Sequence, residues 1–429
     1  MNNIGLLIKL SRIQQNMKQV TLAKGICSTS YLSKIENNQT VPSEDVLQLL
    51  LERLHLDYED LSTEQEVKFL SDLYALYKEA IIERNKEEIV KHLAYYTERN
   101  FLFKDEQNFY TYKLYLLRLY LITDPSGDLC QSLIIALSQM EDNFDKKQTF
   151  LFNLNKGLYY YLEKDFSTSL QAFEVSLSLI TNFHLEDWEL ADFYYTISVS
   201  YLSHNYILNT IEYATKSLNI YKDILVFSRA IDCYLVIGIA NNRNSNFKNA
   251  EESFLLAKKL IKDLKLYKHN SIVNHNLGSL FAIQGQSEKA IEYYKESLKN
   301  SEDTYDYLLT VLSIIIEYSK LKNVEELLVW CEKGISLVTS ESSPDYQSFL
   351  YHFQIYQHLN NNDSEIEMIL INSIKHFELI KEYNYAYKYS IVLGDYYAEN
   401  RKYKNSVIYL QKANSFLYLI KNINHWEDL

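Results

Sequence analysis

Glycine and proline are scarce in this sequence, which has 429 residues but only 9 Gly and 3 Pro. Both residue types interrupt helices, so their scarcity indicates long helices joined by short connections. Cysteine is also scarce: the four cysteines lie far apart in the sequence, and none belongs to a Cys-x-x-Cys pair. This usage is typical of a protein of the reducing cytoplasm.

Long apolar runs and catalytic motifs are absent from the sequence. The longest apolar candidate, Leu308 to Ile316, is interrupted by Thr310 and Ser313 and is about half of the ~18 residues that span a bilayer. Met1-Asn2-Asn3 leads into an amphipathic segment, which is unlike a signal peptide. No P-loop, GxSxG or HExxH motif occurs, and the ten His are scattered. We therefore expect a cytoplasmic protein that is not an enzyme, has no cofactor, metal site or catalytic residue, and binds no membrane.

A helix–turn–helix repeat is present in the second half of the sequence. The stretch from Ser271 to Asn300 consists of two amphipathic segments with a break at residues 284–287. Small residues at Gly278 and Ala290 allow two helices to approach closely, and a large side chain at Tyr294 fills the gap between pairs. This is the tetratricopeptide pattern, in which each unit must stack on its neighbours to bury its apolar face.

Further copies of this unit keep the same register. Small residues recur at Gly238 and Ser198, each 40 residues earlier, at Gly157, and at Gly394. Second-helix markers follow at the same offsets, as at Ala250 and Phe254, and at Ser406 and Leu410, and weaker copies surround Ile315 and Tyr356. An irregular all-helical domain is the alternative, but a phase held over four consecutive units favours repeats. We predict an all-α fold, with a right-handed tetratricopeptide-like solenoid over residues 146–429 and atypical helical pairs over residues 62–145.

The first 61 residues have a different pattern, which predicts a helix-turn-helix domain. Four short helices are expected at residues 4–14, 19–24, 28–37 and 44–54. The third helix has only two core positions, Leu32 and Ile35, and Ser28 is suited to cap it. A helix of this kind, with a small, polar or basic outer face, can approach base edges in a major groove. A small helical cap with a solvated face is the alternative. The outer face comprises Thr29, Ser30, Ser33, Lys34 and Asn37.

Charge is distributed unevenly along the sequence. Residues 1–41 contain five lysines and arginines against one acidic residue, Glu36, whereas the whole chain has a formal net charge of −13. A positive patch attracts phosphate, and an acidic body repels it. We therefore expect contact with double-stranded DNA through residues 1–61 alone.

The N-terminal motif resembles the DNA-binding domain of Gram-positive peptide-pheromone regulators, the group that contains the Rap, Rgg, NprR, PlcR and PrgX proteins. The resemblance rests on Leu22-Ala23-x-x-Ile26-Cys27, on Ser33-Lys34-Ile35-Glu36-Asn37 and on Pro42-Ser43, a run that is similar to the NprR and PlcR pattern. It covers about the first 60 residues by motif, whereas the repeats match by type alone. Asn38 stands where the family usually has Gly, and Asn also tolerates the left-handed conformation that ends a helix.

The resemblance implies an XRE/Cro-type quorum-sensing regulator. Its expected partners are a two-fold-symmetric DNA operator, a short re-imported signalling peptide and further copies of the chain in a dimer or higher oligomer. By analogy with the family, Thr29, Ser30 and Lys34 would face base edges. The full set of expected DNA-binding residues is Gln19, Ser28, Thr29, Ser30, Tyr31, Ser33, Lys34 and Asn37.

Positions on the inner face of the repeats predict where the peptide binds. Counted with the small residue as the eighth position of each first helix, the inner set also includes Tyr161, Leu202, Asp232, Ala282, Lys388 and Asp395. A carboxamide offers a donor and an acceptor, so it can pair with a peptide backbone, and the family uses asparagines in this way. The alternative is that these are solvated polar groups in a groove. The expected peptide-binding residues are Asn155, Asp192, Tyr195, Asn242, Arg243, His275 and Asn276.

Two other functions remain open at this point. Rap and NprR-type proteins also bind a phosphorelay response regulator and drain its phosphate, which in the family requires a glutamine after the first domain. Gln65 and Gln107 lie in that region, but no motif selects either. The chain could also be a helical interaction scaffold with a vestigial first domain.

Overall fold

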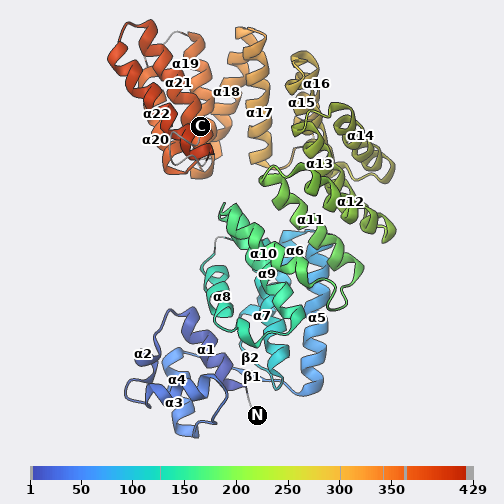
Figure 1. Cartoon of the computed structure of the whole chain (residues 1–429), viewed down its shortest axis with the longest axis vertical. Coiled ribbons are helices and arrows are strands. Elements are labelled where there is room, and N and C mark those ends of the chain that lie inside the picture. Colours follow the sequence, from blue (N-terminus) through green and yellow to red (C-terminus); the bar gives the residue numbers. More distant parts are fainter. Residues whose placement is uncertain (1–2, 126, 300, 342, 362–364, 422–429) are drawn as a thin grey trace. The chain divides into compact units, whose positions relative to one another are not determined.

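The computed structural model describes residues 3–125, 127–299, 301–341, 343–361 and 365–421. These residues form two compact units, one ending at Ser253 and the other beginning at Phe254. The described elements are helices, apart from two strands of two residues each (Figure 1). The predicted all-α fold is therefore confirmed.

The N-terminal helices of the first unit lie where the sequence predicts them. Gly25 forms the turn between the second and third helices with a φ of +76°, and Asn38 ends the third helix with a φ of 52°. The Ser28 hydroxyl accepts a hydrogen bond from the backbone N–H of Tyr31 at 3.1 Å, as expected of a helix cap. The helices are α1 (Ile4–Gln14), α2 (Gln19–Ala23), α3 (Thr29–Glu36) and α4 (Glu44–Leu54).

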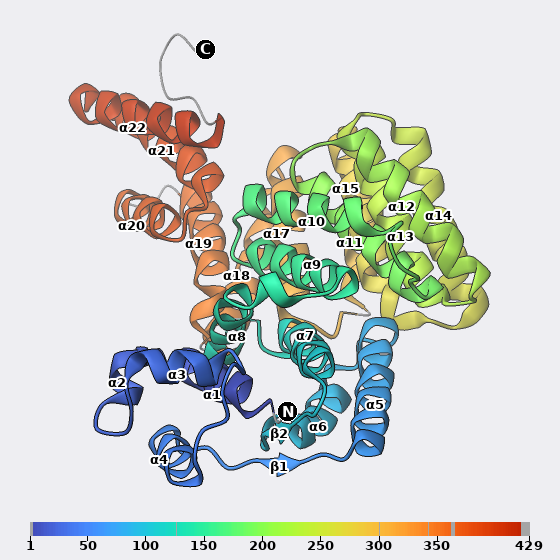
Figure 2. The ribbon, with the colours of Figure 1, turned by 60° about the horizontal axis from the view of Figure 1, so that its bottom comes forward.

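Helix α1 is buried on a second face, in addition to the face that packs inside the helix-turn-helix domain. Leu6 and Leu10 are 2% and 1% exposed, although the sequence pattern assigns only Ile4, Leu7, Ile8 and Ile13 to the core. Helix α8 (Asp128–Ser138) packs against α1, as Figures 1 and 2 both show. The helix-turn-helix domain is thus joined to the rest of the first unit by a packed interface.

A short strand pair makes a second connection between these parts. Strand β1 (Glu59–Asp60) runs parallel to β2 (Phe101–Leu102), and the Asn3 side chain donates to the Lys104 carbonyl oxygen at 2.9 Å. The sequence gives no strand pattern here, because two-residue strands are too short to show an alternation.

Four helices follow the N-terminal domain, as expected of an atypical cap on a repeat array. Ser62 begins the first of them with a reciprocal capping box to Gln65, which satisfies two backbone N–H groups. A single 3₁₀ turn, η1 (Glu141–Asn143), comes after the last helix. The helices are α5 (Thr63–Ile82), α6 (Lys86–Thr97), α7 (Glu106–Thr123) and α8.

Antiparallel helix pairs make up the remainder of both units. In sequence order, the helices are α9 (Lys146–Leu162), α10 (Phe166–Leu179), α11 (Asp187–Ser203), α12 (Ile207–Asp223), α13 (Phe227–Arg243), α14 (Phe247–Leu264), α15 (Asn270–Ile283), α16 (Ser287–Leu298), α17 (Thr304–Lys320), α18 (Val324–Glu341), α19 (Gln347–Asn361), α20 (Ile366–Leu379), α21 (Tyr383–Glu399) and α22 (Tyr403–Lys421). The 3₁₀ turns η2 (Tyr267–His269) and η3 (Pro344–Tyr346) precede α15 and α19.

The repeat markers meet as the sequence pattern predicts. A Cβ added to Gly278 would lie 2.6 Å from the Tyr294 ring, and one added to Gly157 would lie 2.5 Å from the Phe173 ring. These distances are well below van der Waals contact, so the paired helices approach too closely for any larger residue. The glycine and the ring are sixteen residues apart in both pairs. The weaker copies also form helix pairs, with Ile315 on α17 and Tyr356 on α19, but their register stays a prediction.

The scarcity of glycine has a visible consequence at helix ends. Non-glycine residues adopt the left-handed conformation that closes a helix at Lys164, Asn205, Ser245, Lys322 and Arg401, with φ between 54° and 62°. This conformation costs roughly 1 kcal/mol or more for a residue with a Cβ, and packing of the helix pairs offsets that cost. Within the described residues, no helix is both long and apolar enough to cross a membrane.

Candidate DNA interface and ligand cavity

A buried ion pair fixes the geometry of the helix-turn-helix. The Arg12 guanidinium on α1 donates to both carboxylate oxygens of Glu36 on α3, at 2.6 and 2.9 Å, and to the Met17 carbonyl oxygen at 2.9 Å. Gln19, at the start of α2, donates to the same carboxylate at 2.7 Å. Glu36 is 1% exposed. Because fork-shaped Arg–carboxylate pairs are directional, this network holds α1, α2 and α3 at fixed angles.

The outer face of α3 is accessible, as a helix that enters a groove requires. Thr29, Ser30 and Lys34 are exposed, and Tyr31 and Ser33 are half-buried. Ser28 and Asn37, at the two ends of α3, are also exposed, and Gln19 is half-buried beside them. The structure therefore brings the eight predicted DNA-binding residues onto one helix and its immediate neighbours. Their contact with DNA stays a prediction.

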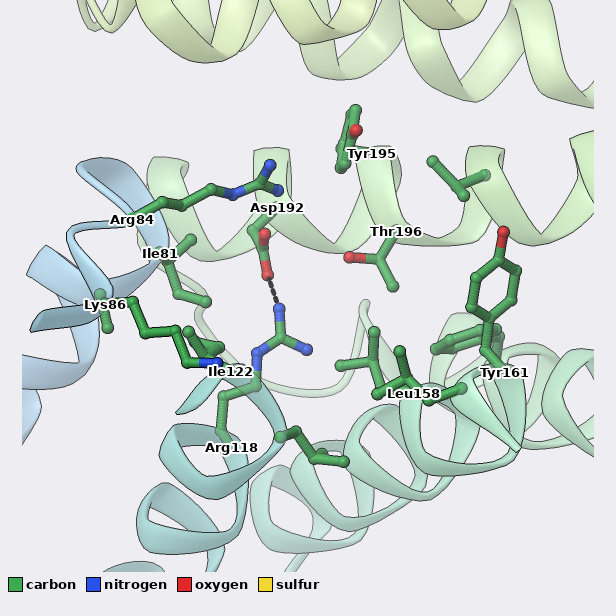
Figure 3. Close-up of a pocket in the computed structure, with 15 residues that line it drawn as sticks. Ile81, Arg84, Lys86, Arg118, Ile122, Leu158, Tyr161, Asp192, Tyr195 and Thr196 are labelled. Carbon is green, nitrogen blue, oxygen red and sulfur yellow. Dashed lines mark hydrogen bonds and ion pairs between the residues drawn. The ribbon is translucent and has the colours of Figure 1, made fainter. Parts of the chain in front are cut away.

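A cavity of about 420 Å³ lies in the first unit. Figure 3 shows it between helices that are far apart in the sequence. Most of its wall is apolar, but three cationic side chains, Arg84, Lys86 and Arg118, face it together with the single carboxylate of Asp192. This excess of positive charge contrasts with the formal charge of −13 on the whole chain. The remaining lining residues are Ala80, Ile81, Leu121, Ile122, Leu158, Tyr161, Leu162, Phe173, Tyr195, Thr196 and Val199.

Arg118 places buried hydrogen-bond donors beside the cavity. One terminal nitrogen, Nη2, donates to Asp192 Oδ2 at 2.6 Å, the contact drawn in Figure 3. The Nε and Nη1 atoms are buried and have no hydrogen-bond partner among the described residues. A buried donor without an acceptor costs about 1–3 kcal/mol. These buried nitrogens can therefore donate hydrogen bonds to a ligand that carries acceptor atoms.

Asp192 belongs to a larger ionic network. Its second oxygen, Oδ1, accepts from Arg229 at 3.4 Å, and Arg229 is also paired with Asp232. Arg84 approaches Asp232 to 3.3 Å and lies over the Tyr195 ring at 5.5 Å from its centroid. Burial raises the pKa of Tyr195 to about 12, reinforced by Asp232 and opposed by the two arginines. Tyr195 is therefore a neutral donor at physiological pH.

Three predicted inner-face residues of the first unit line this cavity, and the other five, Asn155, Leu202, Asp232, Asn242 and Arg243, do not. Tyr161, Asp192 and Tyr195 face it. Asn155 is 1% exposed and donates to the Leu114 carbonyl oxygen at 2.9 Å, so it links α9 to α7 rather than facing a groove. Asn242 is 8% exposed. Arg243 is exposed but donates to the Leu202 carbonyl oxygen at 2.7 Å.

The two predicted peptide-binding residues of the second unit, His275 and Asn276, have different surroundings. His275 is half-buried on α15, and its Nδ1 lies 2.8 Å from the Thr310 hydroxyl. The Thr310 hydroxyl donates its hydrogen to the Asp306 carbonyl oxygen, so His275 Nδ1 carries the proton of this bond. Burial lowers the pKa of His275 to about 4. His275 is therefore a neutral packing residue, whereas Asn276 is half-buried and donates to the Ile272 carbonyl oxygen of its own helix at 2.8 Å.

The sequence analysis did not select the cationic side of the cavity. Arg84 follows α5, Lys86 begins α6 and Arg118 lies on α7, all in the region assigned to a cap without repeat markers. One signal was available: Arg118 interrupts the apolar run Leu114 to Ile122. An arginine within an apolar run is buried only with a partner, which predicts a carboxylate opposite it.

The side chains around the cavity are suited to binding a ligand with an anionic and an apolar part. An anionic group can accept from Arg118 and Tyr195, while an attached apolar group packs against Ile81, Leu158 and Phe173. No group of three or more His, Cys, Asp or Glu residues suited to a metal ion occurs in the part of the chain that the structure describes. The cavity is therefore a candidate site for an amphipathic anion.

A helix-turn-helix at the N-terminus followed by tetratricopeptide-like helix pairs defines a class of protein: regulators with a DNA-binding head and a helical-repeat body. A family model described as "Helix-turn-helix" matches residues 8–61. The transcriptional activator NprA of Geobacillus stearothermophilus is 30% identical over 413 residues, which cover 94% of this chain and 100% of NprA. The chain therefore belongs to the family of the transcriptional activator NprA, and the resemblance inferred from the N-terminal motif is confirmed.

Solved structures show the same fold. The apo form of the quorum sensor NprR from B. thuringiensis aligns with a TM-score of 0.64 at 18% identity, over 83% of this chain and 100% of NprR. NprR in complex with its cognate peptide NprX aligns with a TM-score of 0.56 at 17% identity, over 81% of this chain and 99% of NprR. At these identities the likeness establishes the fold alone.

Proposed function

We propose that this chain is a transcription regulator of the cytoplasm that binds a two-fold-symmetric DNA site through α3 and is switched by a short signalling peptide. The observation that carries the proposal is a cationic, mostly apolar cavity in the same compact unit as the helix-turn-helix. Membership of the NprA family supports the DNA-binding half. The peptide named in the NprR complex supports the other half.

The DNA-binding half predicts a defined loss when Lys34 is replaced. Lys34 is exposed in the last turn of α3, where its ammonium can reach a base edge or a phosphate. Lys34→Ala should weaken binding to a duplex selected by the full-length chain by about 1–3 kcal/mol. Gel shifts at moderate salt would measure it. If the parent chain selects no duplex over bulk DNA, with or without peptide, the regulator proposal is wrong.

The peptide half assigns Arg118 to an anionic group of the peptide. A cavity of about 420 Å³ is within the range of small-ligand sites, so it would hold one end of a peptide of roughly five to ten residues. Arg118→Gln should lower peptide affinity about tenfold to a hundredfold, because it removes charged donors from a buried site. Calorimetry with peptides from short secreted reading frames next to the gene would measure this. Arg99→Gln is the matched control and should bind the peptide like the parent, because Arg99 is 54% exposed and does not line the cavity.

We propose that the chain acts as a homo-oligomer, at least a dimer. One helix-turn-helix buries too little surface for tight operator binding, and two copies double the contact. Light scattering of the full chain with the selected duplex should give a mass of two chains or more per duplex. A single chain per duplex at micromolar concentration would contradict this.

Control of a response regulator is the second function left open by the sequence, and its two candidate glutamines have structural roles. The Gln65 carboxamide oxygen accepts from the Ser62 backbone N–H at 2.7 Å. Gln107 donates to the Asn143 carbonyl oxygen at 3.4 Å. These bonds do not favour a glutamine that acts on a bound partner. Capture of response regulators from a host lysate by the full chain would test that function directly.

A further inference from the structure

A cleft lies along one edge of the helix-turn-helix, and one of its walls comes from outside that domain. It is lined by Lys9 and Arg12 of α1, by Lys18, Gln19 and Val20 around the start of α2, by Glu36 and Asn37 at the end of α3, and by Gln139. Gln139 is the residue that follows α8. Two of the lining residues, Gln19 and Asn37, are in the set expected to face DNA.

The charges in this cleft favour a phosphate group. Arg12 and Glu36 neutralise each other in their buried pair. Lys9 and Lys18 have no carboxylate partner among the described residues, so the cleft carries an excess of two positive charges. The carboxamides of Asn37 and Gln139 have no hydrogen-bond partner within the same residues, and Gln139 is exposed. The cleft therefore presents cationic and neutral N–H donors, which is what a DNA backbone requires.

Gln139 is held at this place by packing. Its backbone N–H donates to the Ala136 carbonyl oxygen at 3.2 Å, which closes the last turn of α8. Leu133, Ala136 and Leu137 of α8 are at most 1% exposed, and α8 packs on α1. The side chain therefore projects from a rigid element, and its position relative to Gln19 and Asn37 is set by the interface between α1 and α8.

We propose that the DNA-contacting surface is not confined to the helix-turn-helix: α8 completes it, and the Gln139 carboxamide donates to a DNA phosphate in the cleft. This inference rests on the proposed DNA-binding function. The proposed contact comes from outside the helix-turn-helix domain, so operator affinity depends on α8 staying packed on α1.

The test uses the full-length chain and a DNA duplex that the parent selects from a random pool. Binding is measured over a range of salt concentrations for Gln139→Ala, Gln139→Glu and Gln139→Lys. Matched controls are Gln131→Ala and Gln131→Lys, at an exposed glutamine of α8 that lines the adjoining depression but not the cleft itself. Lys34→Ala reports on the proposed function independently.

Gln139→Ala should weaken binding about threefold to tenfold, the range for one hydrogen bond to a charged group, and Gln139→Glu should weaken it further by repulsion. Gln139→Lys should keep or raise the affinity and steepen the salt dependence by about one unit per bound chain. Both Gln131 variants should bind like the parent.

Three outcomes would overturn the inference. If Gln139→Ala binds as well as the parent or better, α8 does not complete the surface. If Gln131→Lys has the same effect as Gln139→Lys, the effect is long-range charge and not a contact. If Lys34→Ala weakens DNA binding but the three Gln139 variants bind like the parent, the inference fails while the proposed function holds. A parent chain that selects no duplex would refute both the inference and the proposed function.

Discussion

Buried polar groups are treated differently in the two compact units. Along α15–α18 of the second unit, buried polar groups have partners within these helices. The Ser297 hydroxyl donates to the Ser271 carbonyl oxygen at 2.8 Å, and Glu317, 2% exposed, accepts from Ser287 and from Lys320 at 2.6 Å each. In the first unit, buried nitrogens of Arg118 and the buried side-chain oxygens of Asn155 and Asn242 lack partners among the described residues.

This difference distinguishes polar groups that stabilise helix packing from polar groups that can bind a ligand. A buried polar group with its partner in place contributes modestly to stability, whereas one without a partner costs free energy. Native proteins keep few such groups. The nitrogens of Arg118 lie beside the cavity, where a ligand can supply the missing partners. We therefore propose that a ligand binds in the first unit, beside Arg118, whereas the polar groups of α15–α18 mainly stabilise the packing of their helices.

Replacing Asp192 should have the largest effect on stability. Asp192→Ala would leave Arg118 and Arg229, which are 6% and 1% exposed, without their shared carboxylate. The free energy of unfolding of the first unit should fall by about 3–5 kcal/mol. Hydrogen exchange of peptides from α7, α11 and α13 would measure it.

The control for Asp192 is an exposed ion pair in the same unit. Glu212 and Lys216 pair at 2.6 Å, with side chains 55% and 45% exposed. Glu212→Ala should change stability by less than about 1 kcal/mol. If Asp192→Ala and Glu212→Ala lowered the free energy of unfolding equally, the buried network would contribute no more to stability than the exposed ion pair.

Lowering the pH should destabilise the second unit through His275. Burial lowers its folded-state pKa to about 4, whereas an unfolded histidine has a pKa of about 6.5. As the pH falls from 6.5 to 4, the unfolded state takes up the proton and the folded state does not. Stability should therefore be complete above pH 6.5 and fall by up to about 3 kcal/mol by pH 4.

Comparison of the parent with His275→Gln isolates this effect. Glutamine has no proton to take up in this range, and its carboxamide can still hydrogen-bond to Thr310. Chemical denaturation followed by hydrogen exchange in α15–α17 between pH 7 and pH 4 would show a steeper loss for the parent. Parallel curves for the two proteins would show that His275 is not the titrating group.

Alanine at the close-packed glycines should cost the same in both units. In Gly278→Ala the new Cβ would lie 2.6 Å from the Tyr294 ring, and in Gly157→Ala it would lie 2.5 Å from the Phe173 ring. Each should lower stability by about 1–3 kcal/mol, the usual cost of overpacking. Thermal unfolding would measure both, and a large difference would show that the repeat packing is not equivalent.

Asn276→Ala should have the smallest effect on stability. Its side chain is half-buried and donates within its own helix, so the unfolding free energy should change by less than about 0.5 kcal/mol. Its effect on peptide affinity sharpens the comparison. A tenfold or greater loss in calorimetry would show that the second unit also contacts the peptide, whereas unchanged affinity would restrict the site to the first unit.

The sequence by itself determined the elements and their pairing. The 3.6-residue apolar period and the caps set the bounds of α1–α4 within one or two residues, because both signals are local. The spacing of sixteen residues between Gly278 and Tyr294 predicted their contact for the same reason: a helix, a turn and a helix fix that distance. The family could be identified from the motif between Leu22 and Ser43.

Only the tertiary structure decided which surfaces meet. Arg118 and Asp192 are 74 residues apart in the sequence, and nothing in either local pattern selects the other. Leu6 and Leu10 look like surplus apolar residues in the sequence, but both are buried in the structure. Helix α8 packs on α1, and this interface also brings Gln139 to the cleft. The local pattern of apolar residues indicates how much of a helix is buried. The partner that buries it depends on how the chain closes between distant segments, which local periodicity does not encode.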